Sequence, residues 1–349
     1  MDPAASPLRS RSRRSAGGLS PEDKLVASLI RLMQAGTTPW RRPWDGSASG
    51  GHHVNLLSGR RYRGVNPALL CLGMHSRGSA LPYWCGYSEA RALGISPRKG
   101  SQAVHILRPQ LHRTSGSDPA TGGAGASEGA GPPAGERCGG SVEQEPLSGA
   151  AARQWVSYKP VPVFNAGDLE GEALSALIEQ RRQQAGASSR SEPERLAQAE
   201  AVLSGWEVPI SHGGDQACYL PQSDRIQLPD RSAFHSAPGL YATWAHEAIH
   251  STGHASRLAR DLSGAFGSRA YAREELVAEL GAVLLGDRLR IGSEACHHAA
   301  YLSSWIALLQ ESPRLLFQVL SEARRAAELI CPEEPEEAAP ALNRCAISN

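Results

Sequence analysis

The stretch His246-Glu247-Ala248-Ile249-His250 decides the fold of this chain of 349 residues. We expect it to lie in a helix over residues 238–252. Residues four positions apart share one face of a helix, about 5–6 Å from each other, so His246 and His250 can ligate one tetrahedral Zn²⁺. Glu247 lies beside the first histidine and can hold a metal-bound water as its general base. Two surface histidines beside a glutamate would give the same five letters, so the interpretation needs a third ligand.

A second expected helix, over residues 270–289, offers that ligand. Glu275 and Glu279 are four residues apart and share a face of this helix. One of them can ligate the metal, and the other can accept the N–H of a ligand histidine and fix its tautomer. The order of the two acids resembles that of thermolysin-like zincins, in which the first acid is the ligand, and this resemblance assigns Glu275 to the metal and Glu279 to the histidine N–H. His254 is the alternative third ligand, although the first helix is expected to end before it. Glu274 faces about 100° away from its neighbour, so we expect it to be a solvated surface acid.

Composition restricts the class of protein. The chain is 41% hydrophobic and 20% charged, which allows globular cores. It contains no run of about 18 apolar residues, so the sequence excludes a membrane-spanning protein and predicts no membrane partner. Its seven cysteines are scattered and form no CxxC pair, which argues against a disulfide framework and a zinc ribbon. We therefore expect free thiols and a cytoplasmic location.

The net charge of +1 conceals an asymmetry. Residues 1–110 hold 16 lysines and arginines and five acidic residues, a net charge of +11, whereas residues 111–349 hold 20 basic and 30 acidic residues, a net charge of −10. A strongly basic half is typical of a nucleic-acid partner, although a solvated basic surface is the alternative. Aromatic and basic residues alternate there, a combination that suits single-stranded DNA, although some of the aromatic residues are expected to form the core. The candidate DNA-binding residues are Trp40, Arg41, Arg42, Trp44, Arg61, Tyr62, Arg63, Arg98 and Lys99.

Composition also marks the segment boundaries. Residues 1–19 form a basic leader, which we interpret as a disordered arm, although a transit peptide has a similar composition. Residues 111–153 are rich in glycine and proline and are predicted to be a disordered linker. Residues 331–349 form an acidic tail. The segment 224–229 is either an edge strand that could pair with a peptide or an ordinary core strand.

Periodicity and capping residues predict the regular elements. Helices are expected over residues 20–35, 68–74, 88–93, 169–185, 193–204, 238–252, 270–289, 301–310 and 313–330. Strands are expected over residues 84–87, 103–107, 156–164, 217–220 and 225–228. The chain is therefore predicted to be α+β.

Several motifs together give the chain a resemblance to a known family. They lie at residues 39–44, 62–66, 98–100, 246–254, 257–258, 266–268 and 271–280. With them the chain resembles the ArdC-like antirestriction proteins of plasmids and phages, which are related to the N-terminal region of TraC-type conjugative primases. The glycine-rich segment at 114–153 is atypical of that family, and the basic leader is extra.

The resemblance implies a small basic α+β domain that binds single-stranded DNA, over residues 20–110, followed by a zincin-like metallopeptidase domain of mixed α/β structure, over residues 154–330. It implies that the protein protects mobile DNA against restriction. The expected partners are single-stranded DNA, a protein or peptide substrate, and one Zn²⁺. The alternative is a non-catalytic protein that shields single-stranded DNA and has a structural or vestigial zinc site. Glu247 favours the enzyme, because a structural site needs no general base.

Overall fold

The computed structural model describes residues 21–36, 52–75, 77–79, 81–113, 154–187, 191–291 and 301–333. The chain divides into two compact units, Met1–Leu107 with Pro160–Asn349, and Arg108–Lys159. Helices and mixed sheets make the protein α+β, as predicted. No helix in the described ranges is long and apolar enough to cross a membrane.

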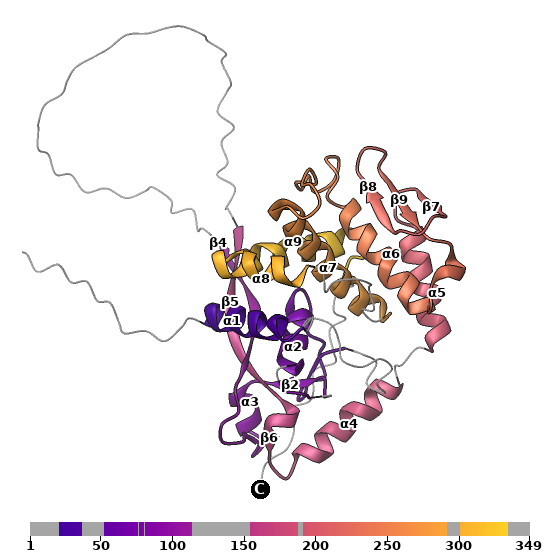
Figure 1. Cartoon of the computed structure of the whole chain (residues 1–349). Coiled ribbons are helices and arrows are strands. Elements are labelled where there is room, and N and C mark those ends of the chain that lie inside the picture. The colour runs from indigo at the N-terminus through magenta and orange to yellow at the C-terminus, as the bar shows by residue number, and fades with distance from the viewer. Residues whose placement is uncertain are drawn as a thin grey trace, which may run out of the picture. The chain divides into compact units, whose positions relative to one another are not determined.

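In the first half of the chain, short strands accompany a buried helix (Figure 1). The elements are α1 (Pro21–Gln34), β1 (Val54–Asn55), α2 (Asn66–His75), β2 (Tyr83–Cys85), α3 (Tyr87–Arg91), β3 (Ser96–Pro97) and β4 (Val104–Arg113). Three of these strands, β1, β2 and β4, form with β5 (Gln154–Asn165) a four-stranded sheet of order β1-β2-β5-β4. In this sheet β1 is parallel to β2, and β2 is antiparallel to β5.

The second half is mainly helical. Its elements are β6 (Leu169–Glu170), α4 (Leu174–Ala187), α5 (Glu192–Ser204), β7 (Ile210–His212), β8 (Cys218–Leu220), β9 (Arg225–Leu228), α6 (Ala237–Ser251), α7 (Arg269–Leu289), α8 (Leu302–Glu311) and α9 (Leu315–Ile330). β6 pairs with β3 of the first half, so the two halves share a small antiparallel sheet.

The two helices that carry the expected metal ligands begin with serine caps. The Ser236 hydroxyl accepts a hydrogen bond from the Gly239 amide at the start of α6, and the Ser268 hydroxyl accepts one from the Tyr271 amide at the start of α7. Such caps satisfy amides that have no partner within the helix. α7 ends at Leu289, and the next residue, Arg290, caps the helix with left-handed backbone angles (φ 59°). Both helices therefore begin at sites defined by the sequence.

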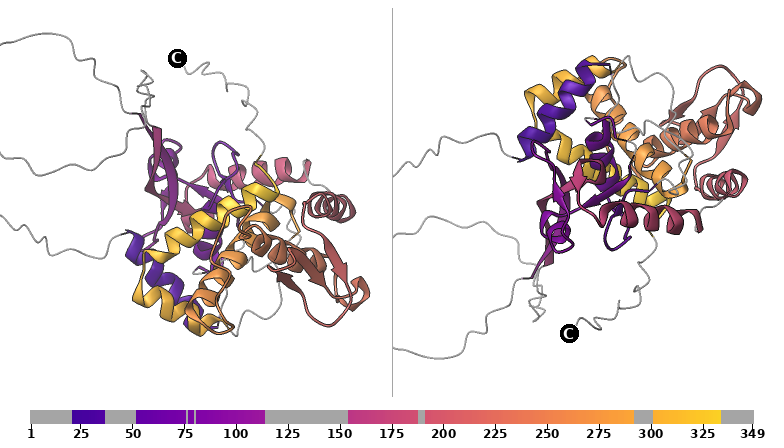
Figure 2. Two further views of the ribbon diagram at one scale, coloured as in Figure 1. Left: turned by 90° about the horizontal axis from the view of Figure 1, so that it is seen from above. Right: turned by 90° about the horizontal axis from the view of Figure 1, so that it is seen from below.

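One hydrophobic core connects α1 and α2 to the C-terminal helices. Val26, Leu29 and Met33 of α1 are buried in the same cluster as Trp305 and Leu309 of α8. Figure 2 shows α1, in indigo, lying along the yellow C-terminal helices in both views. The first helix of the chain therefore belongs to the core that supports the metal-binding helices.

The three-stranded sheet decides between the two interpretations of the segment 224–229. Its order is β7-β9-β8, so β9, which covers most of the segment 224–229, is the central strand. β9 is parallel to β7 and antiparallel to β8. Ile226 and Leu228 are fully buried, as the core-strand interpretation requires. β8 is an outer strand of this sheet, so the edge position that was considered for β9 belongs to β8.

Most expected helices are confirmed within a few residues at each end, and the sulfur atoms of Cys71, Cys85, Cys218 and Cys331 take part in no disulfide bond. β4 extends through Arg113, so the first residues of the expected linker belong to a strand. The leader and the expected linker beyond Arg113 lie outside the described residues, as does the acidic tail beyond residue 333. The boundaries of the two expected functional domains stay a prediction.

Candidate metal centre

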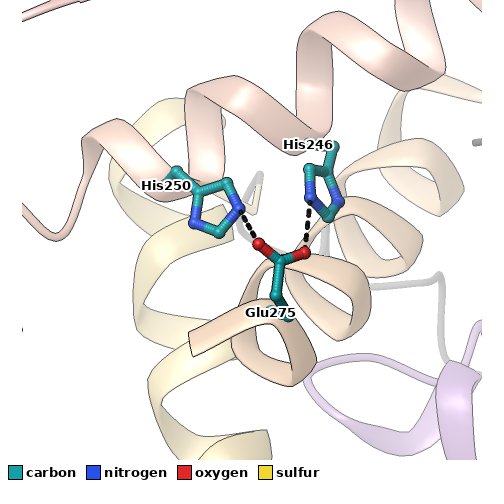
Figure 3. Close-up of side chains that lie close together, drawn as sticks. All are labelled: His246, His250 and Glu275. Carbon is teal, nitrogen blue, oxygen red and sulfur yellow. Dashed lines mark ion pairs between the residues drawn. The ribbon is translucent and has the colours of Figure 1, made fainter. Parts of the chain in front are cut away.

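His246, His250 and Glu275 converge between α6 and α7. Their potential ligand atoms all lie within 4.8 Å of one another. The Nε2 atoms of His246 and His250 lie 3.6 and 3.5 Å from the two carboxylate oxygens of Glu275. Figure 3 shows both imidazoles, from one helix, pointing at the carboxylate of the other. Two imidazoles and one carboxylate form the protein ligand set of many catalytic zinc sites, which leave a fourth position open.

Glu247 lies one residue after His246 and is buried, with 7% of its surface exposed. It lines a cavity of about 1300 Å³ together with His246, His250 and Glu275. β8 supplies Cys218 and Tyr219 to the same wall. A carboxylate in this place can reach a water molecule inside the cavity, which is the geometry that a general base requires.

Glu274 is a buried acid, so the expectation that it would be a solvated surface acid was wrong. Its side chain is only 8% exposed, and its Oε1 atom lies 3.2 Å from Nδ1 of His250. The helical-wheel argument was wrong because α7 is buried on nearly all sides, so a turn of about 100° leads from one buried face to another. Nε2 of His250 is directed at Glu275, and Glu274 contacts the other ring nitrogen, Nδ1. Glu274 thereby orients the His250 imidazole.

Arg260 holds Glu274 in turn, from the loop between α6 and α7. Its Nε and Nη2 atoms donate to the two Glu274 oxygens over 2.9 and 2.8 Å. The same guanidinium donates to the Thr252 hydroxyl and the Ile249 carbonyl, both over 2.8 Å. These hydrogen bonds satisfy polar groups at the C-terminal end of α6. A Cβ atom at Gly253 would lie 3.0 Å from Nη2 of Arg260, so glycine makes room for the guanidinium. The residues after the second histidine thus support the metal ligands.

The ionisation of the site follows from its buried carboxylates. Burial lowers the pKa of His250, but Glu274 and Glu275 outweigh burial and raise it to about 10. Burial raises the pKa of Glu275, but the two histidines outweigh it and hold the pKa well below its usual range. In the metal-free protein, a proton on His250 therefore balances the Glu275 charge.

The other sequence-predicted ligands and supports differ in position. His254 lies beyond the end of α6, where its Nδ1 is 2.7 Å from the Ser256 hydroxyl, and it is not part of the convergent group. Glu279 is fully buried on α7, one helical turn after Glu275. Its role toward a ligand histidine stays a prediction, and the structure shows that Glu274 holds Nδ1 of His250.

The sequence analysis missed two tyrosines at this site. Tyr271 and Tyr301 both line the cavity, and their hydroxyl oxygens lie 3.2 Å apart. Tyr271 precedes Glu275 by four residues and shares its face of α7, a spacing that could have singled it out. Tyr301 comes from the start of α8, and no local pattern points to it.

The candidate DNA-binding residues are distributed over several elements. Trp40, Arg41, Arg42 and Trp44 lie outside the described residues. Arg61 forms a β-bridge with Val54, whereas Arg98 and Lys99 lie in an exposed turn after β3. The described candidates therefore lie beside two different sheets, Arg61 next to β1 and the Arg98–Lys99 turn after β3.

Tyr62 and Arg61 are partly engaged within the protein. Tyr62 packs against the cluster around Trp84, and burial raises its pKa. Arg61 lies 3.5 Å from Asp287 of α7 and is 37% exposed. Arg63 is half-buried. Arg61, Arg98 and Lys99 are thus the exposed residues among the described candidates.

Comparison with known proteins agrees with this architecture. Residues 197–322 match the zincin-like metallopeptidase family MPTase-PolyVal, and residues 21–131 match the N-terminal domain of the anti-restriction factor ArdC. Two DNA primases TraC of Escherichia coli are 35% and 33% identical to the chain over 88% and 87% of its length. The chain spans only 27% and 19% of those primases.

Two crystal structures of the antirestriction protein ArdC from plasmid R388 are similar over most of their length. The metal-free form is 30% identical with a TM-score of 0.59, and the alignment covers 88% of this chain and 96% of that one. The Mn(II)-bound form is 28% identical with the same TM-score, over 89% and 97% of the two chains. The chain therefore belongs to the ArdC antirestriction family, with an ArdC-type N-terminal domain and a zincin-like domain.

Proposed function

We propose that the protein is a zinc-dependent peptidase that also binds single-stranded DNA and protects incoming mobile DNA from restriction. The observation that carries the peptidase is the convergence of His246, His250 and Glu275 beside the buried carboxylate of Glu247. The existence of a Mn(II)-bound form of R388 ArdC supports the binding of a divalent cation by this protein.

The donor set fits Zn²⁺ best among common cations. Imidazole nitrogens suit zinc, whereas magnesium and calcium prefer sites made of oxygen ligands. When bound, zinc would polarise a water molecule and lower its pKa toward neutrality. Glu247 would accept the proton of that water, and His246, His250 and Glu275 would hold the ion. Glu274 and Arg260 would keep the His250 ring in place.

β8 is the proposed binding strand for an extended peptide. It is an outer strand of its sheet, and it lines the same cavity as Glu247. An outer strand presents backbone groups with which a peptide can pair as an additional strand. This role replaces the one that we considered for residues 224–229.

The DNA-binding part of the proposal rests on the +11 charge of residues 1–110 and on the ArdC-type N-terminal match. Each phosphate neutralised in a single strand contributes a slope of about −0.7 to the logarithmic dependence of affinity on salt. Binding of an oligonucleotide should therefore weaken steeply between low and moderate salt. An affinity that does not change with salt would contradict the proposal.

One experiment separates the enzyme from the shielding protein. Wild type and Glu247→Gln should bind one zinc per chain with similar affinity, but the variant should lose turnover of a broad peptide library, because it cannot accept a proton. Glu311→Gln, at an exposed glutamate of α8, is the matched control and should behave like wild type. If Glu247→Gln protects incoming DNA as well as wild type does, protection does not depend on hydrolysis.

A further inference from the structure

The two tyrosines that line the cavity have no part in the proposal so far. Tyr271 lies on α7 and Tyr301 at the start of α8, so they reach the cavity from different helices. Their hydroxyl oxygens are 3.2 Å apart, within hydrogen-bonding distance. Both side chains are half-buried, and each can present a phenolic O–H to the cavity.

The surrounding contacts hold Tyr301 in one orientation. Its ring stacks on Trp305, with centroids 5.9 Å apart and an angle of 29° between the planes. The Trp305 indole is itself fixed, because its Nε1 donates to the Ala272 carbonyl of α7 over 2.9 Å. A donor that is already oriented stabilises a developing charge without reorganisation during the reaction.

Both phenols lie in the negative field of the site. Burial raises the pKa of Tyr271, and its hydrogen bond to Tyr301 and the charge of Glu275 raise it further. Burial also raises the pKa of Tyr301, and the charges of Glu275 and Glu247 act in the same direction. The two hydroxyls thus stay protonated at neutral pH and can act as neutral donors. Tyr301 lines the same cavity as Glu247 and Glu275.

We propose that Tyr301 donates a hydrogen bond to the peptide carbonyl oxygen as negative charge develops on it, and that Tyr271 is the positioning residue that holds the Tyr301 hydroxyl through their 3.2 Å contact. This inference rests on the proposed peptidase function. When the water oxygen bonds to the carbonyl carbon, Glu247 takes the water proton and the C=O electron pair moves onto the oxygen. Tyr301 stabilises that oxygen without giving up its proton. When the C–N bond breaks, the nitrogen takes the proton from Glu247 and the carbonyl re-forms.

The test compares Tyr301→Phe and Tyr271→Phe in the full chain. Tyr241→Phe is the matched control, because it removes a phenol bonded to a carboxylate (2.8 Å to Glu200) from α6 outside the cavity. Three quantities are measured for each: zinc affinity by chelator competition, kcat and KM on a library-derived peptide, and the Kd of a phosphonamidate peptide. The phosphonamidate mimics the tetrahedral state.

We expect Tyr301→Phe to lower kcat about 100-fold with little change in KM or zinc affinity, as for loss of one oxyanion donor. Its affinity for the phosphonamidate should fall as well. Tyr271→Phe should lower kcat less than Tyr301→Phe, and Tyr241→Phe should match wild type in all three quantities. Wild-type kcat in Tyr301→Phe, or loss of its zinc, would overturn the assignment. A larger kcat loss in Tyr271→Phe, with zinc retained, would exchange the two roles.

The outcomes also separate this inference from the peptidase proposal. If wild type binds zinc but cleaves no peptide, the peptidase proposal fails. The phosphonamidate then still decides on Tyr301: equal affinity for wild type and Tyr301→Phe would overturn its role as a donor.

Discussion

At the scale of single residues, Arg260 is the most consequential side chain outside the ligand set. It is 5% exposed and holds the buried carboxylate of Glu274 with two hydrogen bonds. Replacing it by leucine would leave that carboxylate buried without its partner, a change that costs about 3–5 kcal/mol in comparable cases. We expect Arg260→Leu to lower the free energy of unfolding by this amount and zinc affinity by about 10–100-fold. Urea denaturation and chelator competition measure the two effects.

Arg260→Lys is the informative control. Lysine keeps the charge but cannot hold both Glu274 oxygens and the Thr252 hydroxyl in a planar array. It should recover part of the stability and little of the zinc affinity. If both variants bind zinc like wild type, Arg260 stabilises the loop between α6 and α7 but does not support the metal ligands.

The pKa of His250 gives the metal-free protein a pH dependence of known sign. The pKa is raised to about 10 in the folded state, against about 6.5 in an unfolded chain. Its protonation therefore stabilises the folded protein fully below about pH 6.5, and this stabilisation is lost as the pH rises through about 10. The urea midpoint of the metal-free protein should fall over this interval. His250→Gln should remove most of that dependence, and a midpoint independent of pH in wild type would contradict the assignment.

At the scale of elements, the close approach of α6 and α7 sets the distance between the ligands. A Cβ atom at Gly281 of α7 would lie 2.7 Å from Cγ2 of Ile249, a buried side chain next to His250. Alanine favours a helix by up to about 1 kcal/mol over glycine, but here it would force the helices apart. We expect Gly281→Ala to weaken zinc binding by moving the histidines away from Glu275. Adding Ile249→Ala should restore part of the affinity, a coupling that a double-mutant cycle measures.

Helices and the convergent ligands could be predicted because periodicity, caps and motif spacing are local signals. The helix expected over residues 270–289, with Glu275 and Glu279 at i, i+4, placed Glu275 on the correct helix. The partner of His250 could not be predicted, since it depends on the loop that brings Arg260 onto Glu274 and on the burial of α7 from all sides. The position of β9 in its sheet stayed open between edge and core because β7, its parallel neighbour, is a three-residue strand that the sequence did not predict.

At the scale of the molecule, α1 and the zincin-like helices should unfold together. Leu29 is 3% exposed in the core that also contains Trp305 and Leu309. Leu29→Ala should cost about 2–5 kcal/mol and shift one cooperative transition, not melt α1 alone. Tryptophan fluorescence and circular dichroism should give the same midpoint. Separate midpoints would show that α1 folds independently of the metal-binding helices.

The connection between β4 and β5 has a consequence for how this protein can be altered. The two strands are neighbours in one sheet, yet 40 residues separate Arg113 from Gln154. Closing a connection between two strands becomes only about 0.6 kcal/mol more costly each time its length doubles. Lengthening this connection therefore changes the stability of the sheet very little. Evolution can insert sequence here at almost no thermodynamic penalty, and an experimenter can place a reporter domain at the same point.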